Sequence, residues 1–209
     1  MAFSYPLSHP SSGIMKVSVH AINVAAGGSS PFTGESQVYL FAGEWWEFEV
    51  SVALQERAAA EEWITFLLKL NGIYGTFYLN LPATAAPRGS AASAPGTPLV
   101  DGGSQTGNAL NISGAPNGAV DYLKTGDMIQ LGTGTSTRLH KVLADADADS
   151  TGDVELSIWP RLRTSPTNGA AVVVANAKAL CRLKENDRSW NIDEALIYGG
   201  ISFSCKEAL

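Results

Sequence analysis

Three histidines are the first residues to consider for catalysis, because an imidazole exchanges a proton near neutral pH. They are His9, His20 and His140. None of them lies beside a serine or cysteine in a nucleophile-elbow context, and their spacing offers no pair of metal ligands. His20 and His140 fall in alternating segments typical of strands, so we expect solvated or interfacial side chains. The sequence therefore predicts no catalytic residue and no cofactor.

An acidic segment at residues 145–153, which reads DADADSTGD, is the best candidate for a metal site. Alternating carboxylates followed by a glycine are typical of calcium loops, because Ca²⁺ takes several oxygen ligands from one turn. An EF-hand needs flanking helices and a glutamate at its twelfth position, whereas Leu156 stands there between apparent strands. We interpret the segment as a polar hairpin connection and predict no metal. Cation binding by Asp145, Asp147 and Asp149 stays open.

Two further patterns are weak indications of enzymatic chemistry. Residues 132–137 read GTGTST, but no lysine or helix follows, as a phosphate-binding P-loop requires. Glu47 and Glu49 share one face of a strand, which a glycosidase pair would need, but solvated carboxylate pairs have the same spacing. We expect a hairpin at the first site, solvated carboxylates at the second, and no enzymatic activity.

Two adjacent tryptophans, Trp45 and Trp46, indicate an interaction surface. Neighbouring residues of a strand point to opposite faces, so one of them belongs to the core and the other to the outer face. An exposed tryptophan needs a cover, and tryptophan is enriched where interfaces concentrate their binding energy. We hypothesise that Trp45 or Trp46 contacts another molecule, with a covering loop of the same chain as the alternative.

The elements that must position these residues are mostly short strands. The chain has 21 glycines and 10 prolines, which favours many turns and a β-rich fold. Residues 25–33 read as a turn or mobile loop. Alternating or apolar patterns predict strands at residues 14–24, 37–41, 44–52, 76–81, 109–112, 127–131, 138–143, 154–159, 171–174, 179–183, 190–192 and 197–205.

Residues 55–70 form the only segment with a convincing helical period. Its apolar residues recur on one stripe: Ala59, Trp63, Phe66, Leu67 and Leu70. Acidic residues near its start and Lys69 near its end match the helix dipole, and Asn71-Gly72 supplies a stop. We expect the stripe to pack against the strand at residues 44–52.

A stretch rich in glycine, proline and serine, residues 82–107, divides the chain. The strands before it are too few for a sandwich, and the last strands have no other partner. We therefore predict a mainly β protein in which residues 1–81 and 176–209 form one antiparallel, belt-like β-sandwich domain with one packed α-helix. Residues 82–175 would form a small inserted β-barrel or sandwich.

Composition narrows the function classes. The chain of 209 residues has 14 basic and 20 acidic residues, a net charge of −6, which argues against nucleic-acid binding. Charged residues make up 16%, below the roughly 25% of typical soluble domains, which leaves the neutral surface expected of a subunit in an assembly.

The two cysteines and residues 1–13 indicate the cellular compartment in which the protein is made. Cys181 and Cys205 lie in apparent strands, and we expect buried, reduced thiols. Residues 1–13 lack the pattern of a signal peptide, and no stretch approaches the ~18 apolar residues of a membrane span. We expect synthesis in a cytoplasm and no membrane insertion.

Several segments resemble tail proteins of long-tailed bacteriophages, and together they cover most of the chain beyond residue 40. The first group is similar to the N-terminal part of such proteins and the second to their later part. These segments are GEWWEFEV at 43–50, AEEW at 60–63 with Phe66-Leu67, and NGIYGTF at 71–77, then YLKTGD at 122–127 with Ile129-Gln130, LHKV at 139–142, and WPRLR at 159–163. The family that the chain resembles is the distal tail protein, the baseplate hub ring at the tip of a siphophage tail.

The resemblance implies a β-sandwich belt domain with a helix, which six copies arrange into a ring, and a smaller outward domain. It implies the tail tube protein and the tail-tip or baseplate hub proteins as partners, and it supplies no catalytic residues. The location it implies is the virion tail tip, after assembly in the host bacterial cytoplasm.

Other functions remain as alternatives. One is another minor tail, tube or tail-terminator protein. A second is a carbohydrate-binding β-sandwich module, in which Trp45 or Trp46 would stack on sugars. A third is a cell-wall hydrolase, which would need paired carboxylates in one cleft.

Overall fold

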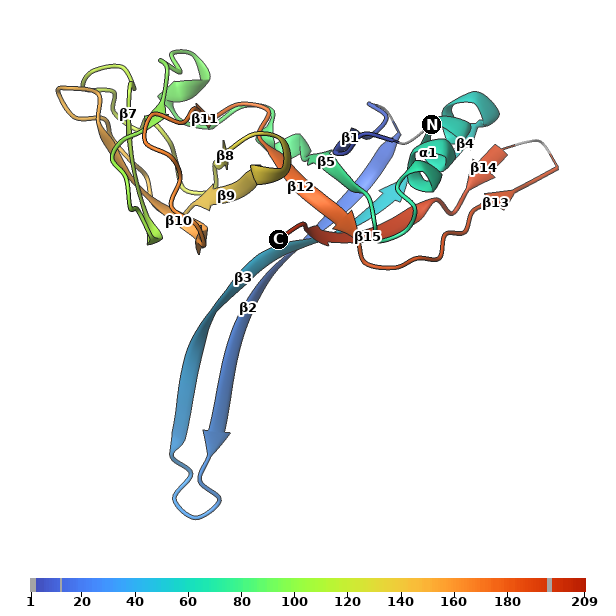
Figure 1. Ribbon diagram of the computed structural model, residues 1–209, viewed down its shortest axis with the longest axis horizontal. Helices are drawn as coiled ribbons and strands as arrows, with labels where there is room; N and C mark the ends of the chain where they lie inside the picture. Colours follow the sequence, from blue (N-terminus) through green and yellow to red (C-terminus); the bar gives the residue numbers. More distant parts are fainter. Residues whose placement is uncertain (1–2, 12, 195–196) are drawn as a thin grey trace.

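The computed structural model describes residues 3–11, 13–194 and 197–209 of the chain. Strands account for 45% of the structure and helices for 11%, which confirms the expected mainly β fold with one α-helix. Figure 1 shows two packed bodies side by side and one long hairpin that projects from between them.

The first body is built on a six-stranded sheet that contains segments from both ends of the chain. Its strand order is β1-β5-β12-β15-β3-β2, and β1 with β5 is its parallel pair. The strands are β1 (Leu7–Ser8), β2 (Ile14–Ser29), β3 (Ser36–Val52), β5 (Thr76–Asn80), β12 (Lys178–Leu183) and β15 (Ser202–Glu207).

One face of this sheet is covered by α1 (Arg57–Lys69). Trp63 is fully buried, and Phe66 meets Phe77 of β5 edge to face with ring centroids 5.4 Å apart. Trp63, Phe66, Leu67 and Leu70 share one cluster with the inward residues of β3, as predicted, whereas Ala59 of the predicted stripe lies outside the cluster and Ala60 belongs to it. The other face carries polar side chains such as those of Glu47 and Ser204.

The helix is shorter than predicted at both ends. Gln55 and Glu56 pair with a strand instead, as β4 (Gln55–Glu56), so the helix starts at Arg57. Its first turn holds no acidic residue, which corrects the expected match to the dipole there, whereas Lys69 does lie in the last turn.

A small three-stranded sheet, of order β13-β14-β4, lies beside the helix. Its other strands are β13 (Asn191–Ile192) and β14 (Ile197–Gly199). The single strand expected at residues 197–205 is therefore two strands, β14 and β15. They are separated at Gly200, which has a φ of +69° that favours glycine.

The second body is a six-stranded sheet of order β11-β8-β9-β10-β7-β6 that curls into a nearly closed barrel. Its ends approach where Leu99 bridges Ala171 and the Val100 amide donates to the Ala170 carbonyl at 2.9 Å. The strands are β6 (Leu99–Val100), β7 (Gly107–Ser113), β8 (Met128–Leu131), β9 (Arg138–Val142), β10 (Val154–Leu162) and β11 (Val172–Val173). Three short helices are η1 (Pro82–Thr84), η2 (Ser90–Ala92) and η3 (Gly134–Ser136).

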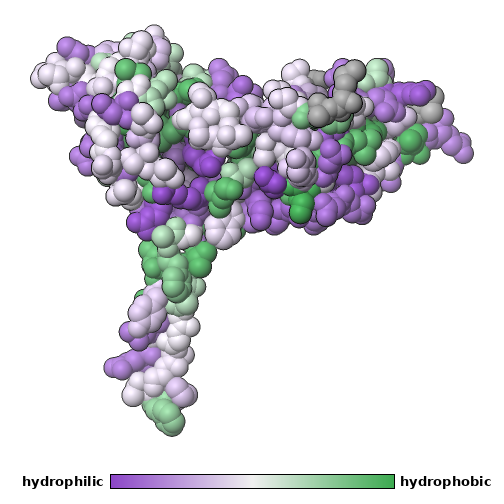
Figure 2. Space-filling view, viewed as in Figure 1, coloured by the Kyte–Doolittle hydropathy of each residue, from purple (hydrophilic) through white to green (hydrophobic). Residues whose placement is uncertain are grey.

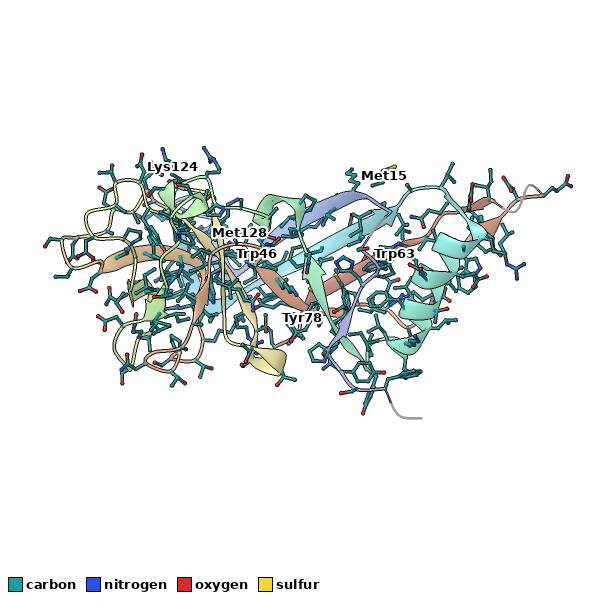
Figure 3. All side chains as sticks on the ribbon, turned by 90° about the horizontal axis from the view of Figure 1, so that it is seen from above. Met15, Trp46, Trp63, Tyr78, Lys124 and Met128 are labelled. Atoms are coloured by element: carbon teal, nitrogen blue, oxygen red, sulfur yellow. The ribbon has the colours of Figure 1, made fainter. Side chains whose placement is uncertain are left out.

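The two bodies share a packed junction around Trp46. Met128 and Leu139 of the second body belong to the same apolar cluster as Trp46 and Phe48, and Figure 3 shows Trp46 and Met128 together where the bodies meet. The chain enters and leaves the second body through neighbouring strands, because Asn80 of β5 pairs with Lys178 of β12.

Both cysteines are buried and free, as expected. Cys181 and Cys205 lie on adjacent strands, and burial raises the pKa of the Cys181 thiol well above its ordinary value. Neutral, enclosed thiols of this kind are inert, so they act as small apolar residues of the core.

Candidate functional site

The most distinctive feature of the molecule is the outer part of the hairpin formed by β2 and β3, residues 24–42, called the arm below. It extends away from both bodies (Figure 1). Every residue of the arm except Ser30 is exposed. Paired strands rise by about 3.3 Å per residue, so the paired part of the arm reaches on the order of 20 Å beyond the body.

The arm corrects two sequence predictions. Residues 25–33 were expected to form a loop, and residues 37–41 and 44–52 two separate strands. Instead β2 continues to Ser29 and β3 runs unbroken from Ser36, with Ala25 opposite Leu40 and Gly28 opposite Gln37. The small residues of β2 pair with β3 through backbone hydrogen bonds. This pairing depends on the partner strand, so the local sequence of residues 25–29 does not predict it.

The arm carries large apolar side chains on both of its faces. Along β3, alternate residues point to opposite faces, so Val38 and Leu40 share one face and Tyr39 and Phe41 the other. Figure 2 shows hydrophobic surface near the root of the arm and again at its tip. The exposed fractions are 68% for Val38, 57% for Tyr39, 70% for Leu40, 51% for Phe41 and 94% for Phe32 at the tip.

Nothing within the hairpin covers these side chains. They stand opposite small residues of β2, for example Tyr39 opposite Ala26 and Val38 opposite Gly27. Cross-strand neighbours of that size cannot bury a large side chain. In addition, β2 is the last strand of its sheet, and β15 pairs only with the part of β3 from Glu47 onward. Both edges of the arm therefore present unpaired backbone groups.

The arm is nearly free of charge, since Glu35 is its only charged residue. Depletion of charge with enrichment of aromatic residues is the composition of the core of a protein interface. An isolated two-stranded hairpin is also marginally stable in water. Both considerations make the arm the candidate surface for contact with another molecule.

The root of the arm is fixed to the second body. The indole Nε1 of Trp159 donates to the Asn23 side-chain oxygen at 3.0 Å, and the Arg161 amide donates to a carboxylate oxygen of Glu44 at 2.7 Å. Gly43 packs so closely that a Cβ there would meet a Val24 methyl at 2.8 Å. The arm therefore leaves the body in a direction set by specific contacts.

The two tryptophans divide as strand alternation predicts. Trp46 is 3% exposed, and its Nε1 donates to the Leu139 carbonyl at 2.9 Å. This corrects the hypothesis for Trp46, which packs between the two bodies and has no face left for another molecule. Trp45 is half-buried on the other face, with its Nε1 donating to Glu47 at 3.1 Å. An intermolecular contact by Trp45 stays a prediction.

The acidic segment is held by hydrogen bonds within its own loop and to the neighbouring connection before β8. It connects β9 to β10, which pair as an antiparallel hairpin, as interpreted from the sequence. Asp145 accepts from the amide and hydroxyl of Thr125, and Asp149 accepts from the amide and hydroxyl of Thr151. These bonds lower the pKa of both carboxyls. Among the described residues, no group of three or more His, Cys, Asp or Glu side chains is placed to hold a metal ion.

The other candidates for chemistry are dispersed. The Glu47 carboxylate accepts from the Lys184 ammonium at 2.7 Å, and that bond, with the one from Trp45, lowers the pKa of Glu47. His9 stacks on Trp63 with ring centroids 5.7 Å apart, and His20 lies 3.8 Å from Glu49 on the sheet. The GTGTST segment connects β8 to β9 through η3, as expected of a hairpin.

His140 differs from its expected solvated or interfacial position. It is 5% exposed, and its Nδ1 lies 2.7 Å from the Pro160 carbonyl oxygen. Burial lowers the pKa of His140 to about 4, so the ring is neutral at pH 7. Because a carbonyl only accepts, the single ring proton sits on Nδ1 and Nε2 carries a lone pair.

The comparisons with known proteins add no relative. No protein-family model matches the chain, and no curated protein matches it. Within the described residues, no helix is long and apolar enough to span a membrane. The case for function therefore rests on the arm.

Sequence reasoning missed the arm, although two signals were present. Residues 38–41 are consecutively apolar, so both faces of that strand carry large side chains. Residues 24–42 contain a single charge, which is unusual for a segment first interpreted as a loop and an isolated strand. Together these signals describe an element that needs cover on both sides.

Proposed function

We propose that this protein is a structural subunit of a bacteriophage tail that works as a closed ring, with the distal tail hub, which joins the tail tube to the tail-tip proteins, as the specific role. The observation that carries the proposal is the arm, an apolar and almost uncharged hairpin with both edges open. The resemblance of segments such as GEWWEFEV at 43–50 to tail proteins supplies the biological setting.

A ring subunit must offer two different patches, one to each neighbour, so that a head-to-tail contact closes. An arm that leaves the body in a fixed direction is suited to be one of these patches. Its tip lies far from the body of its own chain (Figure 1), so the surface that covers it belongs to another molecule. Six-fold closure follows from the family resemblance alone.

One observation weighs against the carbohydrate-binding alternative. Sugar stacking needs an aromatic ring with an open face. Trp46 is enclosed by the second body, and the Trp45 indole is held by Glu47. Other exposed aromatic residues are spread over the described chain: Phe32, Tyr39 and Phe41 lie on the arm, and Phe3 and Tyr74 lie outside it.

The first test compares the full chain with a chain that lacks the arm. Residues 24–43 are replaced by Asn-Gly, which closes the in-register pair Asn23 and Glu44 with a two-residue turn. We expect the shortened chain to fold, with a circular dichroism spectrum that is still of the β-sheet type, and to remain monomeric, whereas the full chain gains mass with concentration. An arm-deleted chain that assembles like the full chain contradicts the proposal.

The second test concerns the particle. Labelled antibody against the chain should bind at the tail tip of phage particles, and quantitative mass spectrometry should give six copies per tail or a multiple of six. A single copy per particle, or a symmetric two-fold dimer as the working form, contradicts a ring hub.

A further inference from the structure

The second body contains a cavity whose chemistry complements the tip of the arm. It has a volume of about 310 Å³ and lies between the β8–β9 connection and the segment that follows β10. That volume is at the lower end for ligand sites, which suits one or two side chains better than a cofactor. Leu131, Leu162 and Ala170 supply apolar wall, and Arg138 and Arg163 supply charge.

The cavity is a positive site in an acidic protein. The chain carries 20 acidic residues against 14 basic ones, yet the residues that line this cavity include two arginines and no carboxylate. Arg163 already pairs with Glu207 at 3.0 Å. Arg138 is the residue of interest, because within the described part of the chain it has no ion pair.

Arg138 donates only from Nη1, to the backbone carbonyls of Thr135 and Thr137 at 3.2 and 2.7 Å. Its Nε and Nη2 have no acceptor among the described residues. The guanidinium is half-buried, and burial lowers the pKa of Arg138. A partly desolvated guanidinium with unused donors is a binding site for a carboxylate, whose two oxygens can accept two parallel hydrogen bonds from it.

The tip of the arm presents one apolar and one acidic side chain on an ordered turn. The Ser30 amide donates to the Glu35 carbonyl at 2.8 Å, and the Gly34 amide to the Ser30 carbonyl at 3.0 Å. The Ser30 hydroxyl also accepts from the amides of Phe32 and Thr33, each at 3.3 Å. These bonds fix a turn on which Phe32 is almost fully exposed and Glu35, the single charge of the arm, is exposed as well.

We propose that the tip of the arm of one copy docks in this cavity of a second copy, with Phe32 against the apolar wall and Glu35 paired with Arg138. This inference rests on the proposed function and names the surface that receives the arm. The tip of a chain cannot reach its own cavity, because the arm points away from the second body (Figure 1). Each copy therefore gives one tip and receives another, which is the head-to-tail arrangement that closes a ring.

The decisive test reverses charges in the full chain. Glu35→Arg and Arg138→Glu, each alone, should weaken self-association at least about tenfold, because each places like charges at the contact. The two substitutions together should restore most of it. Glu155→Arg is the matched control for Glu35→Arg, since it makes the same change in net charge at an exposed site on the outside of β10. Light scattering over a concentration series gives the association constant, and circular dichroism checks that each variant is folded.

A second test captures the contact even where association is weak. A chain with Phe32→Cys is mixed with a mass-tagged chain carrying Ser165→Cys in the cavity wall, and the disulfide product is measured by mass spectrometry. Ser150→Cys, in the exposed acidic loop, replaces Ser165→Cys as the control. The native cysteines are buried and do not compete. We expect the tip-to-cavity product and little tip-to-loop product.

The outcomes separate the docking site from the proposed function. Loss of assembly on arm deletion, together with unchanged assembly in both charge reversals and no tip-to-cavity product, overturns this docking site and leaves the ring proposal standing. Unchanged assembly on arm deletion overturns the ring proposal itself. If either charge reversal weakens self-association and the double variant does not restore it, the Glu35–Arg138 pair is overturned.

Discussion

The indole rings of Trp46 and Trp159 meet edge to face, with centroids 4.4 Å apart and an interplanar angle of 83°. Trp46 comes from the first body and Trp159 from the second, and each indole nitrogen donates across the junction, to Leu139 and Asn23 respectively. Such aromatic pairs add about 0.5–1.5 kcal/mol beyond the burial of their area. The two bodies are therefore joined by directional contacts as well as by the chain.

The first prediction is that residues 82–175 can be deleted and that the remaining domain folds with a lower free energy of unfolding. Because Asn80 pairs with Lys178, a short Gly/Ser linker can join the two strands directly. The remaining domain should unfold cooperatively in urea. Its free energy of unfolding should be lower, because exposure of Trp46 loses on the order of 2–3 kcal/mol of hydrophobic stabilisation.

Adding Trp46→Ser to that deletion should improve solubility, because an apolar ring no longer faces water. A remainder that loses cooperative unfolding with either residue at position 46 would show that the two bodies fold only together.

The second prediction concerns Trp63, a fully buried residue of α1 on the side of the helix that faces the sheet (Figure 3). Trp63→Ala should lower the free energy of unfolding by about 3–5 kcal/mol and leave little soluble protein. Leu68→Ala, on the exposed side of the same helix, is the control and should change stability by less than about 0.5 kcal/mol. Equal stability of the two variants would mean that the helix is not docked on the sheet.

The sequence was sufficient to predict features that follow from a single periodic pattern, either helical or strand-like. The stripe that contains Trp63 follows the helical spacing, and the division of Trp45 from Trp46 follows strand alternation. Both depend only on near neighbours in the chain, so a single sequence contains them. Leu139 as the partner of Trp46 lies far along the chain, and no local pattern points to it.

The arm and the cavity could not be found in the same way. A run such as residues 38–41 normally indicates a buried strand, because sequence reasoning assumes that the covering surface belongs to the same chain. The cavity combines Arg138 with residues 162–170, which meet only after the barrel has closed. Its positive character depends on which side chains line it, whereas the chain as a whole has a net charge of −6.

The third prediction tests the ion pair between Arg163 and Glu207. Glu207 is 2% exposed, and its carboxylate accepts from Arg163 at 3.0 Å. Arg163→Met leaves that charge buried without its partner and should cost about 3–5 kcal/mol in urea unfolding. Adding Glu207→Gln should recover much of the loss, because a neutral amide costs less to bury. Equal stability of the single and double variants would argue against the pair.

The fourth prediction is a pH dependence from His140. Its pKa falls from 6.5 to about 4 on folding, so the unfolded chain binds the proton more readily between those values. Stability from this residue is present above pH 6.5 and is lost as the pH falls toward 4. Between pH 7.5 and pH 5 the loss should be about 2 kcal/mol.

His140→Asn, whose amide can still donate to the Pro160 carbonyl, should flatten that part of the stability profile measured by urea unfolding. His20→Asn, at an exposed position on β2, is the control and should keep the slope. A slope that survives in His140→Asn would assign the pH dependence to other groups.

The open edges of the arm also have a consequence for the chain before it meets a partner. A strand edge with free backbone groups accepts another strand without regard to its origin, and the arm contains no lysine to discourage this. In newly made copies, ordered assembly would therefore compete with irregular aggregation through these edges. Aggregation would gain as the protein concentration rises. In the proposed ring, the segment that joins the subunits would therefore also limit how much unassembled protein a cell can hold in solution.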